Sequence, residues 1–274
     1  MLTATILALS AAVLHAGWNL SVKQSGDRYL ALWGQFSIAG VIGLVWLLIA
    51  GGIPAEGWMW AGVSGCIHLP YCIFLARAYD HGDFSLVYPM ARGGGALLAA
   101  IGGIVLLGDD LSALAIGAVC MVAFGLFLLG GHARGPEMVS ALVVACTIGA
   151  YSLSDAKGIR SIDTPLYALA SFTGTAVTTT AYGLLRGRGV EMRDAMRLNW
   201  RRFTLMGLAS ALTYGMVQIA FTYAPVGYVT ALRESSVVLA AFAGSRMLGE
   251  AAGRRRMVAS GVVVAGLVLL VVAR

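Results

Sequence analysis

Four charged side chains lie within otherwise apolar stretches of the sequence: Arg92, Asp155, Arg233 and Glu234. A guanidinium group presents a planar fork of donors that matches a carboxylate or phosphonate, so the two arginines suit recognition of an anionic group on a small molecule. A carboxylate in the same surroundings can take up and release a proton, which makes Glu234 and Asp155 candidates for ion coupling. Asp155 lies near the end of its predicted helix, two residues before Lys157, so an acid at the membrane interface is the alternative for it. A second interpretation stays open, in which an arginine pairs with one of these acids and locks two parts of the protein together.

Uncharged polar residues recur at helical spacing and would line the same space. His15, Trp18 and Asn19 are spaced i, i+3 and i+4, which places them on one face of a helix. Histidine and tryptophan among apolar neighbours also serve as packing residues, so a binding role for them is a hypothesis. The candidate substrate-binding set is His15, Trp18, Asn19, His68, Tyr71, Tyr88, Arg92, Tyr151, Ser154, Tyr214, Gln218 and Arg233.

The elements that carry these residues must be membrane-spanning helices. Hydrophobic residues make up 59% of the 274-residue chain and charged residues only 12%, too few polar groups to cover a globule in water. A helix needs about 20 apolar residues to cross a bilayer, and ten such runs predict an all-α membrane protein with ten transmembrane helices. The runs are residues 3–22, 29–51, 58–79, 84–107, 111–131, 138–158, 166–185, 202–223, 226–248 and 257–272.

Two segments, residues 92–109 and 233–250, match at a constant offset and indicate an internal duplication. Both begin with an arginine, contain an Ala-Ala pair and end in a Leu-Gly-acid turn, at Asp109 and at Glu250. Because five helices per copy is an odd number, the second copy must enter the membrane upside down. We therefore expect two inverted five-helix repeats around a central cavity, residues 1–134 and 135–274.

Positive charges are distributed unequally between alternate connections. Of the 19 lysines and arginines, 14 fall on one side and three on the other, and the remaining two are Arg92 and Arg233. By the positive-inside rule the richer side faces the cytoplasm, which with an even number of helices places both termini outside it. The preference for arginine over lysine is typical of a GC-rich bacterium, so we expect a bacterial plasma (inner) membrane.

Over essentially its whole length the chain resembles the EamA-type members of the drug/metabolite transporter superfamily. The shared pattern is a tyrosine, a spaced helix, a Leu-Gly-acid turn and a glycine-bearing final helix. The family usually has glutamate in both turns, and Asp109 departs from it conservatively in the first. The resemblance implies ten helices in two inverted repeats, a central cavity lined by helices 1, 3, 4, 6, 8 and 9, and helices 5 and 10 at the outside. The residues that carry it are Ala78-Tyr79, Leu107-Gly108-Asp109, Gly117, Thr222-Tyr223, Leu248-Gly249-Glu250 and Gly261.

Together these features predict a secondary transporter. It would move a small polar metabolite with an anionic group across the membrane by alternating access, with protons as the candidate coupling ion and Glu234 as their first candidate carrier. Its partners would be the small-molecule substrate, the lipid bilayer and protons. Efflux of amines or drug-like compounds is the alternative within transport, and a structural or sensory membrane protein is the alternative outside it.

Other chemistries find no support in the sequence. Gly93-Gly94-Gly95 lacks the lysine and the hydroxyl of a phosphate-binding loop, so ATP is not expected to drive the protein. There is no nucleophile elbow, the four cysteines share no metal-ligand spacing, and no basic face is interleaved with aromatic residues. We therefore expect no enzyme activity, no cofactor, no metal and no nucleic-acid partner.

Overall fold

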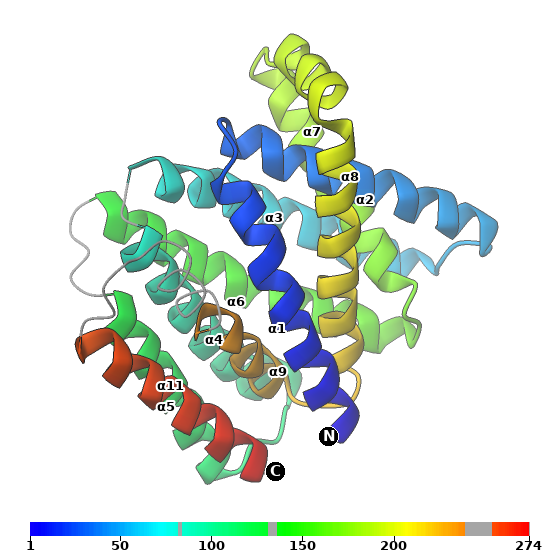
Figure 1. The fold of residues 1–274 in the computed structure, drawn as a ribbon. Coiled ribbons are helices and arrows are strands. Elements are labelled where there is room, and N and C mark those ends of the chain that lie inside the picture. The colour runs from blue at the N-terminus through cyan, green and yellow to red at the C-terminus, as the bar shows by residue number, and fades with distance from the viewer. Residues whose placement is uncertain (82–83, 131–135, 239–253, 274) are drawn as a thin grey trace.

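The computed structural model of the chain describes residues 1–81, 84–130, 136–238 and 254–273, and within these ranges all regular structure is α-helical (Figure 1). Some side chains at helix ends, that of Tyr88 among them, are outside this description. Apolar runs become helices because, without water, the backbone must satisfy its own hydrogen bonds. The described helices are α1 (Leu2–Lys23), α2 (Arg28–Ile49), α3 (Ala55–His81), α4 (Phe84–Leu107), α5 (Ala113–Gly130), α6 (Pro136–Ile162), α7 (Tyr167–Leu185), α8 (Gly189–Ala220), α9 (Val226–Arg233) and α11 (Arg254–Val272).

Six of these helices are long and apolar enough to cross a membrane, namely α1, α2, α3, α4, α6 and α8. Shorter apolar helical stretches occupy Ala113–Leu128 in α5 and Val258–Val272 in α11. Large apolar side chains such as Leu48 and Val105 are exposed, whereas polar side chains such as Gln35 are fully buried. This is the reverse of the distribution in a water-soluble protein, and it makes the chain a multi-pass membrane protein.

The predicted start of the eighth helix is wrong. α8 begins at Gly189, within a stretch assigned to a loop on its charge, and departs from helical geometry at Asn199, where φ is −119° and ψ is 15°. Arg193 and Arg197 are exposed on this first part of α8. A criterion based on apolar runs could not find a polar helical segment of this kind.

The prediction of one continuous helix from residue 226 onward is also wrong, because the helix is interrupted at Glu234. α9 ends at Arg233, and residues 235–238 are helical again after one turn residue, Glu234. The N–H of Glu234 donates to the carbonyl of Ala231 at 3.0 Å, three residues back instead of four. Such tightening marks a local 3₁₀ turn, and it breaks the helix at a buried acid. Residues 239–248 lie outside the described part of the chain.

α6 is longer than the predicted run at residues 138–158, since it continues to Ile162. Asp155 consequently lies inside this helix and not at its end, and its exposed fraction is 0%. The extension also places Arg160 within the last turn of α6.

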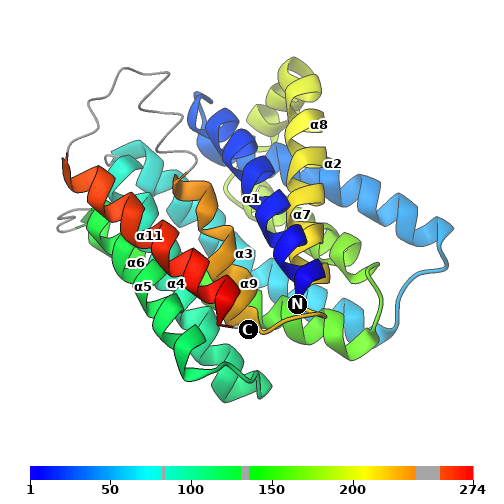
Figure 2. The same ribbon diagram turned by 60° about the horizontal axis from the view of Figure 1, so that its bottom comes forward.

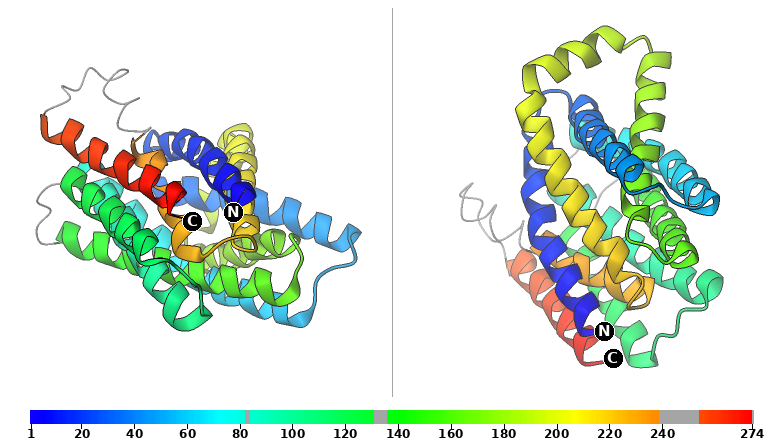
Figure 3. Two further views of the ribbon diagram at one scale, coloured as in Figure 1. Left: turned by 90° about the horizontal axis from the view of Figure 1, so that it is seen from below. Right: turned by 90° about the vertical axis from the view of Figure 1, so that its right-hand side faces the viewer.

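The helices pack in pairs that join the two halves of the chain. α1 lies along α8, α3 contacts α6 and α7, and α2 contacts α7 and α8 (Figures 1 and 3). α5 and α11 pair with each other at one edge of the molecule (Figure 2), and α4 contacts α5, α6 and α9. The two ends of the chain lie close together in all these views. An even number of membrane crossings would require both ends on one side.

Glycines allow α4 to approach its neighbours closely. A Cβ atom on Gly227 of α9 would lie 2.5 Å from the Cβ of Ala100 of α4, so only glycine fits there. A Cβ on Gly95 of α4 would meet Cγ2 of Ile148 of α6 at the same 2.5 Å. Small residues at helix contacts are how membrane helices pack, and here they bring the polar residues of α4 and α9 face to face.

Asp109, the acid of the first Leu-Gly-acid turn, ties the two halves together. Its Oδ1 accepts a hydrogen bond from Nη1 of Arg160 at 2.7 Å, and its Oδ2 accepts one from the N–H of Val226, the first residue of α9, at 2.6 Å. Nε of Arg160 donates to the carbonyl of Phe221 at 2.7 Å. A Cβ atom on Gly103 would come within 2.9 Å of Oδ2 of Asp109, so glycine leaves room for the acid. We call this group the Asp109–Arg160 clasp.

Candidate substrate-binding site

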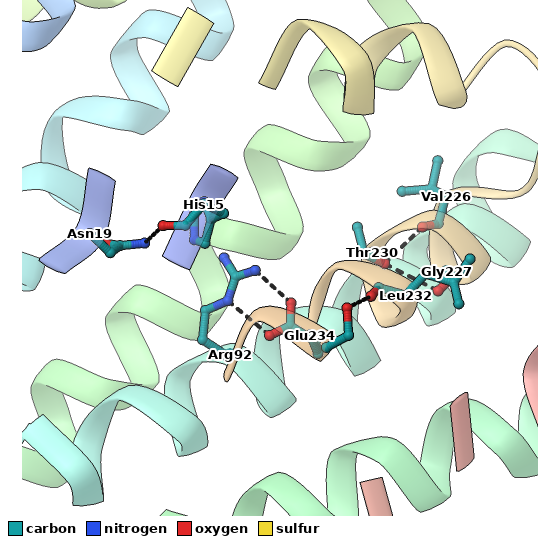
Figure 4. Close-up of polar contacts among 9 residues, drawn as sticks. His15, Asn19, Arg92, Val226, Gly227, Thr230, Leu232 and Glu234 are labelled. Carbon is teal, nitrogen blue, oxygen red and sulfur yellow. Dashed lines mark hydrogen bonds and ion pairs between the residues drawn. The ribbon is translucent and has the colours of Figure 1, made fainter. Parts of the chain in front are cut away.

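Arg92 of α4 and Glu234, at the break after α9, form a buried ion pair (Figure 4). Nε of Arg92 donates to Oε2 of Glu234 at 2.9 Å, and Nη2 lies 2.7 Å from Oε1. The guanidinium fork thus engages both carboxylate oxygens, the strongest arrangement available to an ion pair. The bond connects the first half of the chain with the second, so it can also lock the two halves together.

α1 brings a second group of predicted residues to this pair. His15 and Asn19 lie on the segment of α1 drawn beside Arg92 in Figure 4, and the His15 ring interacts electrostatically with Arg92 and Arg233. Trp18 packs edge-on against His15, with ring centroids 4.8 Å apart. Nδ2 of Asn19 donates to the carbonyl of His15 at 3.1 Å. All three residues of the α1 stripe are buried.

His68 and Tyr71 of α3, Tyr151 of α6 and Tyr214 of α8 form an aromatic cluster. The His68 ring stacks on Tyr151 with centroids 4.2 Å apart, and Tyr71 and Tyr214 pack edge-on against Tyr151 at 5.5 and 5.7 Å. Edge-to-face contacts of this kind contribute about 0.5–1.5 kcal/mol each beyond burial. Three helices thus bring four of the predicted binding residues together.

Asp155, one helical turn after Tyr151 on α6, holds one ring of the aromatic cluster. Its Oδ2 accepts a hydrogen bond from the Tyr214 hydroxyl at 2.6 Å, and its Oδ1 accepts one from the Tyr167 hydroxyl at 2.9 Å. Two hydroxyl donors give both oxygens of this buried carboxylate a partner. Asp155 therefore fixes the position of Tyr214.

Arg233, the last residue of α9, lies against the same cluster. Its Cζ is 5.3 Å from the centroid of the Tyr214 ring, which is a cation–π contact. Its exposed fraction is 3%, and Nε has no hydrogen-bond partner among the described residues. A buried guanidinium with an unfilled donor can accommodate an anionic group.

The remaining predicted residues differ in their surroundings. Nε2 of Gln218 donates to Oγ of Ser171 at 2.9 Å. Oε1 of Gln218 and Oγ of Ser154 are buried and have no hydrogen-bond partner in the part of the chain that the structure describes. Tyr88 lies within α4, but its side chain is outside the described residues.

Comparison with known proteins places this arrangement in a family. The model of the EamA-like transporter family matches residues 135–272. The chain belongs to this family. A solved structure described only as "Crystal structure of protein" shares the fold, with a TM-score of 0.76 and 20% identity over 99% of each chain. A search of curated proteins gave no match.

Membership of the EamA-like family makes the chain a membrane transporter, with a small molecule as substrate and the bilayer as its surroundings. The matched residues include all of α7, α8 and α9. They also contain the members of the candidate site in the second half, namely Tyr151, Ser154, Asp155, Tyr214, Gln218, Arg233 and Glu234.

Sequence reasoning missed two residues of this EamA-like transporter, both on α7. Tyr167 donates to Asp155, and Ser171 accepts from Gln218. The family resemblance does not include helix 7 among those that line the cavity, so neither residue was considered. Their i, i+4 spacing was the available signal, because it places both on one face of α7.

Proposed function

We propose that this EamA-like protein carries a small polar metabolite with an anionic group across the membrane by alternating access, driven by protons. The proposal depends on the surroundings of Arg233. This arginine is buried over the Tyr214 ring, and its Nε has no hydrogen-bond partner among the described residues. An anionic group at this position would fill the donor and offset the charge. The aromatic cluster and the α1 stripe would supply the remaining contacts.

Glu234 suits the role of proton carrier because its carboxylate occupies the fork of Arg92. Protonation of Glu234 would weaken this pair and make the Arg92 fork available to an anionic substrate group. Proton and substrate would then bind together, since each favours the state that the other needs. Asp155 is the second candidate, although its two hydroxyl partners suit a positioning role.

Efflux of amines is a second candidate function, and the aromatic cluster favours it. Faces of tyrosine rings attract ammonium groups, Tyr71 and Tyr214 pack against Tyr151, and the Tyr214 hydroxyl donates to the buried carboxylate of Asp155. The two proposals differ in the group that meets the ligand, which is Arg233 for an anion and a carboxylate with tyrosines for an amine.

The packing of the helices supports the proposal of two inverted five-helix repeats, residues 1–134 and 135–274. If each helix in the first half is exchanged for its equivalent in the second, the α1–α8 pair becomes the α6–α3 pair, and both pairs are present. The same exchange converts α2–α8 into α7–α3, and both are again present. It leaves α2–α7, α4–α9 and α5–α11 unchanged, as expected for pairs at a two-fold axis.

The ligand class is tested by thermal unfolding of the purified protein with amino acids, organic acids, phosphonates and amines. We expect an acid or phosphonate to raise the Tm, and Arg233→Gln to remove most of the shift. An amine that raises the Tm equally in the wild type and in Arg233→Gln would support the second function instead.

The proton role of Glu234 is tested in proteoliposomes that hold the compound found by this screen. Glu234→Gln permanently mimics the protonated state, so we expect exchange of labelled compound to persist while accumulation driven by an imposed pH gradient disappears. Glu191→Gln is the matched control, because Glu191 is 58% exposed on α8. Undiminished accumulation by Glu234→Gln would rule out this carboxylate as the carrier.

We also propose that both termini lie outside the cytoplasm, in the plasma membrane of a bacterium. The connections on one side carry 14 lysines and arginines and those on the other side carry three, and the richer side is expected to face the cytoplasm. A reporter active only in the cytoplasm should give signal when fused within residues 186–202 and none when fused after Arg274. The reverse result would invert the orientation and leave the helix arrangement unchanged.

A further inference from the structure

α9 is a short helix with one end at the Asp109–Arg160 clasp and the other at the candidate substrate site. It has eight residues, and at 1.5 Å per residue it is about 12 Å long. Figure 4 shows Val226 at one end of this helix and Glu234 just beyond the other. A single short helix moves as one body, so whatever holds the Val226 end also sets the place of Arg233 and Glu234.

Asp109 caps α9 from the other half of the chain. Pro225 precedes the helix, and its ring has no oxygen to offer to the first N–H groups. Oδ2 of Asp109 takes this role by accepting the N–H of Val226 at 2.6 Å. The carboxylate also meets the positive end of the helix dipole. The position of α9 thus depends on a side chain in the connection between α4 and α5.

Arg160, in the last turn of α6, holds both sides of this cap. Its Nη1 donates to Oδ1 of Asp109 at 2.7 Å, while Nε and Nη2 donate to the carbonyls of Phe221 and Ala224 at 2.7 and 3.1 Å. One guanidinium group thereby joins the α4–α5 connection to the α8–α9 connection. The ends of α4, α6, α8 and α9 meet here, and all four helices carry residues of the candidate site.

A surface pocket of about 390 Å³ lies over the clasp. Asp109 and Arg160 line it, together with the exposed acids Asp110 and Asp163. The side chain of Arg160 is 27% exposed and that of Asp109 8%, whereas Glu234 beyond the far end of α9 is 2% exposed. The clasp is therefore the boundary between a pocket at the surface and the buried site.

We propose that Asp109 and Arg160 are positioning residues of the transporter, which close this end of the passage and hold α9, with its Arg233, at the candidate site. Parting of the ion pair would release the first turn of α9 and connect the pocket with the site. The pair suits this role because it is partly exposed, so water can replace its contacts at a small cost. The inference rests on the alternating access of the proposed function and not on the identity of the substrate.

The reactivity of a buried thiol tests the proposal without any substrate. Ser154 lies on α6 between the aromatic cluster and the clasp, and its Oγ is buried with no hydrogen-bond partner among the described residues, so cysteine fits in its place. A small water-soluble methanethiosulfonate reagent is added to purified full-length Ser154→Cys protein in detergent. Peptide mass spectrometry follows this thiol separately from the four native cysteines. We expect Asp109→Asn and Arg160→Gln each to raise its labelling rate about fivefold, a conformational coupling of ordinary size.

A double variant and a matched control locate the effect at the ion pair. Asp109→Asn combined with Arg160→Gln should react at most about twofold faster than either alone, because both remove the same contact. Asp110→Asn removes the same charge from the exposed neighbouring position in the pocket and should stay within about twofold of the parent rate.

Three results would overturn the proposal. Unchanged labelling in the clasp variants would make the clasp a static tie, and an equal rise in Asp110→Asn would assign the effect to the charge of the pocket. Labelling that rises only in step with a fall in Tm would report unfolding. A ligand screen in which no compound binds would leave the labelling result as it is, so this proposal and that of the substrate fail separately.

Discussion

Arg92 and Arg233 occupy equivalent positions in the two matching segments, yet their surroundings differ. Arg92 is held by both oxygens of Glu234, whereas Arg233 lies over the Tyr214 ring, and its Nε has no hydrogen-bond partner among the described residues. The acid is present in one segment alone, because Arg233 is followed by Glu234 and Arg92 by Gly93. The two matching segments thus carry one arginine in a buried ion pair and one whose Nε has no hydrogen-bond partner among the described residues.

Glu234 pairs with the distant arginine and not with its neighbour in sequence for a geometric reason. Successive residues of a helix point about 100° apart, so the side chains of Arg233 and Glu234 leave the backbone in different directions. The break after α9 and the close contact of α4 with α9 at Gly227 then place Glu234 opposite Arg92.

The largest expected difference between the two arginines is in stability. Arg92→Ala leaves Glu234 as an unpaired buried charge and should cost about 3–5 kcal/mol, while Arg233→Ala removes a cation–π contact of about 1 kcal/mol. Denaturant unfolding in detergent measures both. Arg92→Met with Glu234→Leu, which removes both charges, should recover most of the larger loss. Equal losses for the two single variants would remove the distinction drawn between these arginines.

A smaller difference is expected in ligand affinity. Arg233→Lys keeps the charge but loses the planar fork, so we expect binding of the anionic compound to weaken about tenfold, or about 1.4 kcal/mol, with little change in Tm. Arg92→Lys should weaken binding less and lower the Tm more. Titration calorimetry on both variants separates the two effects, and the opposite order would exchange the roles of the two arginines.

The smallest effect is expected at the Asp109–Arg160 clasp, an ion pair at the edge of the fold. The Arg160 side chain is 27% exposed, against 2% for Arg92 and for Glu234. Asp109→Asn keeps an acceptor for the N–H of Val226 and should cost about 1 kcal/mol or less. Asp110→Asn, at the exposed neighbouring position, is the matched control. A loss at Asp109 as large as that of Arg92→Ala would make the clasp, and not the buried pair, the main connection between the halves.

Much of the fold could be predicted because hydrophobicity is a local property. The start of α4 at Phe84 and its end at Leu107 agree with the predicted run, since an apolar stretch between polar turns has one favourable arrangement in lipid. The first part of α8 and the break at Glu234 could not be predicted this way. The first part of α8 is polar, so apolar runs do not mark it, and the acid at the break pairs with Arg92, which lies far away in the chain.

For the site, the sequence by itself determined which side chains are buried polar groups and which of them share a helix face. The i, i+3, i+4 stripe of His15, Trp18 and Asn19 and the membrane location of Arg92 follow from composition and helical spacing alone. Only the tertiary structure decided the partners, because a buried charge or hydroxyl bonds to whatever the packing of other helices brings within about 3 Å. Packing brings Glu234 to Arg92 and two tyrosine hydroxyls to Asp155, and it leaves Nε of Arg233 without a partner in the described residues.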